Sequence, residues 1–206
     1  MPSQFPSFEV VHKPSKFPPV ARQALERFPI DASVILPTLN KCAELDRAGN
    51  LPSGHLWIVI YSGPGRVALV LACTQGYMGA YPIFIVNTDA IDDADFNPCI
   101  HLSALTLKRH VPIERVYSVF APIRITKRFS EMWTQLTGVQ PEAKPYYDSK
   151  ISHLRWHEGL QQPFISPEGR VEVGLASQAD IQPIARLCHE FAKDSVSRRL
   201  PCVSAV

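Results

Sequence analysis

The sequence lacks the cysteine patterns of disulfide-rich and zinc-ribbon domains. Its 206 residues include five cysteines, an odd number, and no CxxC pair occurs among them. A disulfide framework needs paired cysteines and a zinc ribbon needs closely spaced pairs, so we expect neither. The first residues also lack the unbroken apolar segment of a secretory signal, because Glu9 and several prolines interrupt them. We therefore expect a cytoplasmic protein with reduced thiols.

Long hydrophobic runs and a strong charge imbalance are also absent. The most apolar stretch, residues 56–73, is divided by the turn residues Gly63–Arg66, and neither half is long enough to cross a bilayer as a helix. With 21 basic and 19 acidic residues, the formal net charge is only +2, which is too small to indicate a polyanionic partner. We therefore expect no membrane partner and consider nucleic acid unfavoured.

Two local features nevertheless suit nucleic acid, and each has a simpler interpretation. Gly76–Gly79 has the GxxG pattern of a backbone clamp, but it lies between two expected strands, so it predicts a tight loop. A basic stretch interleaves Tyr117 and Phe120 with six cations. These are Lys108, Arg109, Arg115, Arg124, Lys127 and Arg128. A solvated helical face over a core of the two aromatics is the favoured interpretation of that stretch.

Motifs for metals and for nucleophilic catalysis are incomplete. Residues 93–97 place oxygen ligands at the spacing of a calcium loop, but Pro98 and Ala104 stand where glycine and glutamate are needed. We expect an acidic surface loop there. Histidines at 153 and 157 have no evident third ligand, and the HExx pattern that begins at His189 lacks its second histidine. No GxSxG motif occurs and no Cys–His pair can be singled out, so no metal is expected.

Two helices are expected near the N-terminus. Apolar residues recur at helical spacing over residues 19–28, directly after two prolines that suit a first helical turn. Thr38 is placed to cap a second helix, which Gly49 would end.

Three apolar, β-branched runs occupy the centre of the chain, at residues 56–61, 67–72 and 81–87. The glycine-rich joint between the first two predicts an antiparallel pair of strands. The third run is continuous, which is typical of a strand buried on both faces. We therefore expect a sheet in the centre of the chain.

Further elements follow in the second half. Helical spacing predicts helices over residues 112–120 and 126–136. Apolar residues alternate over residues 171–175, which indicates a half-buried strand, and Ser177–Asp180 resembles the capping box of a helix that continues to Phe191. The chain thus closes on a β-α unit.

These elements predict an α+β fold with a mixed, mainly antiparallel central sheet flanked by helices. Clusters of prolines indicate the divisions between segments. We expect a flexible arm at residues 1–13, a first domain at 14–155, a linker at 156–169 and the β-α start of a second unit at 170–206.

The order of helices and strands over residues 19–137 resembles the GNAT superfamily of acyl-CoA N-acyltransferases. The chain also resembles fungal proteins of this type, whose two-part layout is similar to that of glycine N-acyltransferase-like enzymes. Three segments carry the resemblance: HLWIVIYSGPGRVALVLACTQGYMGAYPIFIVNT, then RVYSVFAPIRITKRFSEMWTQLTG with PYYDSKIS, then RVEVGLASQADIQPIARLCHEFAKDS. The resemblance implies a degenerate GNAT-like domain at 14–155 and the start of a catalytic GNAT domain at 170–206.

The resemblance stops short of the cofactor loop. In the family, an Arg/Gln-x-x-Gly-x-Gly/Ala loop at a helix N-terminus holds the cofactor pyrophosphate through backbone amides. Residues 88–93 read TDAIDD, with carboxylates and no glycine, and no such loop follows Ser195. We therefore expect a first domain that does not bind the cofactor in the usual way, followed by a catalytic domain that is truncated or differently spliced. The tail is either genuine or a splice or gene-model product. By resemblance, His189 and Glu190 could line an acceptor pocket, although exposed helix positions are the simpler interpretation.

The function implied by the resemblance is transfer of an acyl group from acetyl-CoA or another acyl-CoA to an amine. The chain would be an N-acetyltransferase-like relative that is incomplete or inactive as it stands. The alternative is a non-enzymatic GNAT-like regulatory or protein-interaction module, and nucleic-acid binding ranks third. Expected partners are acyl-CoA, a small-molecule amine and a second copy of the chain that completes the sheet.

Overall fold

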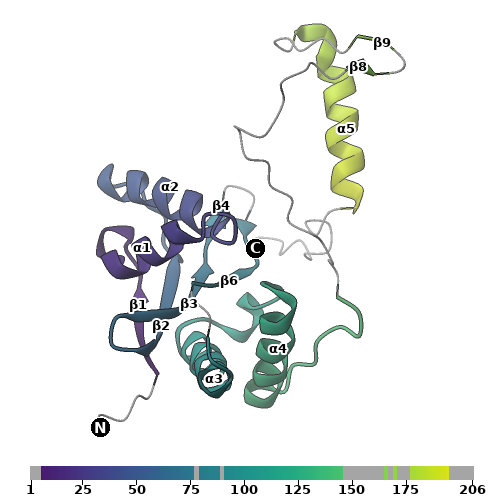
Figure 1. Cartoon of the computed structure of the whole chain (residues 1–206). Coiled ribbons are helices and arrows are strands. Elements are labelled where there is room, and N and C mark those ends of the chain that lie inside the picture. The colour runs from purple at the N-terminus through teal and green to yellow at the C-terminus, as the bar shows by residue number, and fades with distance from the viewer. Residues whose placement is uncertain are drawn as a thin grey trace, which may run out of the picture. The chain divides into compact units, whose positions relative to one another are not determined.

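The structure is a computed structural model, and it describes residues 6–76, 79–88, 91–145, 165–166, 169–170 and 177–194. The chain divides into two compact units, residues 1–141 and 142–206, and each unit is described by itself (Figure 1). Most of the linker expected at 156–169 lies outside the described residues, as do the strand expected at 171–175 and the tail after Asp194.

Unit 1 is built on a five-stranded sheet in the order β1-β2-β3-β6-β7. The strands are β1 (Ser7–Val11), β2 (Leu56–Gly63), β3 (Arg66–Cys73), β6 (Ile83–Asn87) and β7 (Val119–Phe120). The first three neighbouring pairs are antiparallel and the β6–β7 pair is parallel. Between β3 and β6, the short strands β4 (Gln75–Gly76) and β5 (Gly79–Ala80) form a separate hairpin. The expected α+β fold with a mixed, mainly antiparallel sheet is confirmed.

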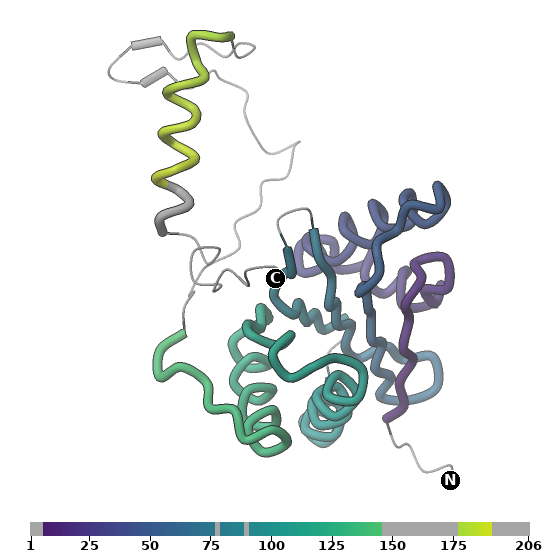
Figure 2. Tube along the Cα trace, turned by 180° about the vertical axis from the view of Figure 1, so that it is seen from behind, coloured from purple at the N-terminus to yellow at the C-terminus, as the bar shows by residue number. Residues whose placement is uncertain are grey.

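Helices cover both faces of this sheet. They are α1 (Pro19–Arg27) and α2 (Ile35–Arg47) on one face, and α3 (Asp93–His110) and α4 (Ile123–Thr137) on the other (Figures 1 and 2). A 3₁₀ turn, η1 (Pro14–Lys16), joins β1 to α1. Trp57, Val59 and Tyr61 of β2 belong to the core under α1 and α2, whereas Ile58 and Ile60 belong to the core under α3 and α4. Because both faces are covered, β2 is apolar at each of the consecutive positions 56–60 rather than at every second one.

Several sequence predictions are confirmed closely. The helix expected at 19–28 is α1, the helix expected at 126–136 lies within α4, and the three expected runs form β2, β3 and β6. Gly138 ends α4 in the left-handed region, with φ of 79°, which glycine adopts without a steric cost.

The start of α2 differs from the prediction. The helix begins at Ile35, so Thr38 is not its cap. Thr38 instead donates its hydroxyl to the Val34 carbonyl at 2.9 Å, within the first turn of the helix. Pro37 lies in the same turn, where its missing N–H costs no helical hydrogen bond.

The acidic loop expected at residues 93–97 is wrong, because α3 begins at Asp93. Pro98 lies inside this helix. It lacks the N–H that would bond the Ala94 carbonyl, and this loss makes the local sequence unfavourable for a helix. Burial of Phe96, Cys99 and Ile100 against the sheet outweighs that loss. Packing here overrides local propensity.

Two further expectations are corrected at the sheet edges. The helix expected over 112–120 is wrong, since η2 (Ile113–Arg115) is a single 3₁₀ turn and β7 follows it. Val119 and Phe120 instead pair with Ile83 and Phe84 of β6. At the other edge, residues 7–11 are not part of an arm, because β1 pairs with β2 along its whole length.

Unit 2 is described in part. A short antiparallel pair, β8 (Ile165–Ser166) and β9 (Gly169–Arg170), precedes the 3₁₀ turn η4 (Gln178–Asp180) and α5 (Ile181–Asp194). The predicted capping box is confirmed: the N–H and the hydroxyl of Ser177 both donate to Asp180 Oδ2, at 2.7 and 2.8 Å. Within the described ranges, none of the helices combines the length and apolar character that crossing a bilayer requires.

Candidate functional site

The parallel strands β6 and β7 bring two helix N-termini to one end of the sheet. Each strand is followed by a helix, α3 after β6 and α4 after β7, so both helices start where the strands end. Only two residues of each strand pair, and β6 continues through Ile85–Asn87 beyond the last pair. Helix N-termini carry free N–H groups and a partial positive charge, which suit anionic ligands. This end of unit 1 is therefore the candidate ligand site.

The N-terminus of α3 is occupied by the chain's own carboxylates. Asp92 is the N-cap residue, and Asp93 and Asp95 stand in the first turn. Carboxylates in these positions stabilise a helix, and they would repel a phosphate or pyrophosphate at the same place. The loop that leads to α3 also has no glycine to let a ligand approach the backbone. The residues present therefore do not fit the pyrophosphate that the GNAT resemblance implies.

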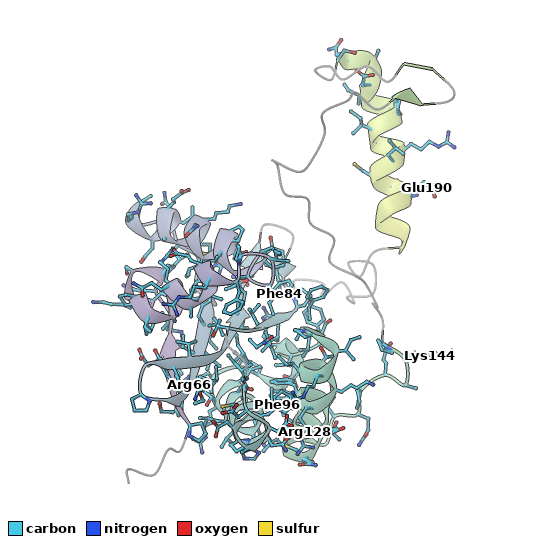
Figure 3. The ribbon with its side chains drawn as sticks, in the orientation of Figure 1. Arg66, Phe84, Phe96, Arg128, Lys144 and Glu190 are labelled. Carbon is cyan, nitrogen blue, oxygen red and sulfur yellow. The ribbon has the colours of Figure 1, made fainter. Side chains whose placement is uncertain are left out.

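Two arginines of α4 contact residues in the first turns of α3. Arg124 forms an ion pair with Asp93, and its guanidinium lies 4.0 Å from the centre of the Phe96 ring. One turn further along α4, Arg128 donates to Asn97 Oδ1 at 2.8 Å. Figure 3 labels Phe96 of α3 and Arg128 of α4. The guanidinium groups of Arg124 and Arg128 thus contact α3.

The basic stretch is largely used inside the protein. Lys108 donates to the Leu136 carbonyl, and Arg115 donates to two carbonyls, besides the contacts of Arg124 and Arg128. Four of the six cations therefore have partners within unit 1. The expected solvated helical face over a core of Tyr117 and Phe120 is wrong, because Arg115 lies in the 3₁₀ turn η2 and Tyr117 is exposed. The internal partners of the four cations nevertheless weaken the nucleic-acid hypothesis.

Arg115 fastens the base of the β4–β5 hairpin. Its guanidinium donates to the Thr74 carbonyl at 2.7 Å and to the Tyr81 carbonyl at 2.9 Å. Tyr81 N–H also donates to the Thr74 carbonyl at 3.0 Å, and Tyr117 donates its hydroxyl to the Ala80 carbonyl at 2.6 Å. These hydrogen bonds therefore hold together the two chain segments that leave β3 and enter β6.

The GxxG of the sequence lies in this hairpin and has a steric role. Gly76 and Gly79 pair across β4 and β5. A Cβ atom on Gly76 would lie 2.1 Å from the hydroxyl oxygen of Tyr81, so the Tyr81 ring packs directly over the Gly76 backbone. The two glycines belong to a hairpin between strands, as the sequence predicts, and not to a helix-joining clamp.

One cysteine–histidine contact was not found from the sequence. Cys42 Sγ of α2 lies 3.8 Å from Nδ1 of His55, and both residues are buried. The His55 ring stacks on Trp57 with centroids 5.9 Å apart and planes 11° apart. Burial raises the pKa of Cys42, an effect that Lys41 partly opposes, and burial lowers the pKa of His55. The pair is therefore a neutral thiol beside a neutral imidazole, whereas nucleophilic catalysis requires a thiolate.

His189 and Glu190 lie exposed on α5 (Figure 3 labels Glu190). Consecutive positions on a helix are about 100° apart, so the two side chains leave α5 in different directions. The histidines at 153 and 157 lie outside the described residues. In the part of the chain that the structure describes, no three His, Cys, Asp or Glu side chains gather as a metal site would require.

Comparison with known proteins found no matching family model, no matching curated protein and no matching solved structure.

Proposed function

We propose that the chain is a relative of the GNAT acyl-CoA N-acyltransferases in which unit 1 is a non-enzymatic binding module. The order α1, α2, β2, β3, β6, α3 supports the relation, because it repeats the central helix and strand order expected from the resemblance. The four described cysteines are free, which is compatible with a cytoplasmic location. Both the family and the location belong to this proposal.

The acidic N-terminus of α3 is the observation that carries the proposal. The family's cofactor pyrophosphate depends on free N–H groups at a helix N-terminus. In unit 1 the corresponding helix begins with Asp92, Asp93 and Asp95, and Arg124 is paired with Asp93. A polyanion brought to this end would meet carboxylates instead of amides. Among the described residues of unit 1, the N-terminus of α3 therefore does not offer the amide-lined site that holds an acyl-CoA in the usual way. This favours a module that acts by binding a partner.

Acyl transfer is the second candidate, and the uneven lengths of β6 and β7 favour it. Ile85–Asn87 of β6 extend beyond the last residue pair with β7, and a groove of the family type would lie beside such an extension. The reaction would need a deprotonated amine and a thioester carbonyl polarised by an N–H donor. His189 and Glu190 would then be candidates for an acceptor pocket in unit 2, with acyl-CoA and a small-molecule amine as ligands. No described residue is assigned to either chemical role.

Thermal unfolding of the full chain with acetyl-CoA and longer acyl-CoAs separates the two candidates. Free CoA and ATP are the controls for binding through phosphates alone. A ligand at 100 times its dissociation constant adds about 2.7 kcal/mol, which raises the midpoint by roughly 5–10 °C for a protein of this size. We expect no saturable shift. A shift specific to acyl-CoA, accompanied by thiol release when amines are added, would contradict the binding-module proposal and favour acyl transfer.

A further inference from the structure

A buried polar contact between Cys42 and His55 lies beside α2, on the face of the sheet that this helix covers. Ile35, Leu39 and Cys42 of α2 belong to the same buried core as Trp57 and Val59 of β2, and Cys42 also contacts His55. His55 directly precedes β2, and the next inward-facing side chain is Trp57. The contact therefore joins α2 to the residue directly before β2.

The surroundings of His55 offer little to a positive charge. His55 is 5% exposed, Cys42 is 4% exposed and Trp57 is fully buried. Burial is the cause that lowers the pKa of His55, with no contribution from a charged group. The titratable group that faces it from α2 is the Cys42 thiol, on which Lys41 acts, and the residue that faces it from β2 is Trp57. A thiol is a weak hydrogen-bond acceptor, so the Trp57 ring face is the main group here that could stabilise an imidazolium.

We propose that the Cys42–His55 contact is an acid-sensitive latch that holds α2 on the sheet and releases it when His55 gains a proton. An imidazolium in this layer stays poorly solvated until α2 moves and admits water. The released state binds the proton more tightly than the closed state, so acid shifts the equilibrium towards release. Release would expose Leu39 and Trp57, which are fully buried in the closed state. Unit 1 would then present an apolar surface only under acidic conditions.

Hydrogen exchange of the full chain between pH 7.5 and 5.0 tests the latch, after correction for intrinsic exchange rates. The unperturbed pKa of histidine is about 6.5, and one proton changes an opening equilibrium at most tenfold per pH unit. We expect protection of the α2 amides to fall by up to about tenfold per unit below pH 6.5, while α4 stays protected. His55→Gln should remove this dependence. His101→Gln, a change at an exposed histidine of α3, should leave it intact.

A second measurement covers the case in which His55→Gln does not fold. The His55 ring of the unmodified chain can be titrated by NMR, and we expect its midpoint below 6.5, within the pH range over which α2 protection falls. A midpoint at or above 6.5 would mean that Trp57 stabilises the charged ring, and the latch would be rejected. Unchanged α2 protection, simultaneous loss in α2 and α4, or the same response in His55→Gln would each overturn it as well.

Discussion

Replacement of Arg115 by alanine tests how much of the stability of unit 1 depends on the fastening of the β4–β5 hairpin. The guanidinium donates to a partly buried carbonyl of Thr74 and to an exposed carbonyl of Tyr81. A hydrogen bond to a charged group contributes about 1.5–3 kcal/mol when shielded and less when exposed. The Thr74 carbonyl keeps its bond from Tyr81 N–H, so no buried acceptor is left without a partner. We therefore expect a loss of about 2 kcal/mol from Arg115→Ala.

Urea unfolding followed by tryptophan fluorescence measures this loss, because Trp57 and Trp133 are both buried in unit 1. Arg109→Ala is the matched control: it removes the same charge from the basic stretch at an exposed position of α3, and it should change the free energy of unfolding by less than about 0.5 kcal/mol. Arg115→Lys should recover only part of the loss, since an ammonium cannot reach two carbonyls in a fixed fork. Equal stability of Arg115→Ala and the unmodified chain would show that the Arg115 hydrogen bonds do not stabilise unit 1. Full recovery by lysine would show that bonding to both carbonyls is not needed.

Three further predictions concern the core, a helix end and alkaline pH. Phe129→Ala, at a fully buried position of α4, should cost about 3–5 kcal/mol in urea unfolding. A loss below 1 kcal/mol would contradict the packing described. Gly138→Ala should cost about 1 kcal/mol in thermal unfolding, because alanine is strained at φ of 79°; Gly63→Ala, where an added Cβ atom meets open space, is the control. Burial, with a smaller contribution from Asp95, raises the pKa of Cys99 from 9.0 to about 11. The folded state therefore holds a proton that the unfolded state releases, and stability should fall between about pH 9 and pH 11. Urea midpoints across that range should decline less steeply for Cys99→Ala.

The sequence predicts the centre of unit 1 better than its edges. Continuous apolar, β-branched residues at 56–61 and 67–72 leave little choice but paired strands, and the strong stripe of α4 ends at a glycine that the structure needs there. The missed elements depend on distant contacts. β7 has two residues and exists because it pairs with β6, and α3 contains a proline whose cost only its packing explains.

The candidate site divides in the same way. The carboxylates at 92, 93 and 95 are evident from the sequence, although their place in the first turn of α3 is not. Cys42 and His55 are 13 residues apart in the chain, and no local spacing indicates that they meet. Arg115 and its acceptors are 34 and 41 residues apart. Such contacts follow from the sheet order, which a single sequence does not supply.

The two edge strands of the five-stranded sheet, β1 and β7, bear on self-association through the sheet. An exposed edge strand is a template on which further chains can polymerise. At one edge β7 offers two residues, too few for a stable extra strand. At the other, β1 has Glu9 at its midpoint and lies between Pro6 and Pro14. A second copy added symmetrically about that midpoint would set Glu9 against Glu9, and like charges directly opposite are unfavourable. Edge-to-edge stacking into fibres is thus opposed at both margins, and a dimer centred on the β1 midpoint is disfavoured.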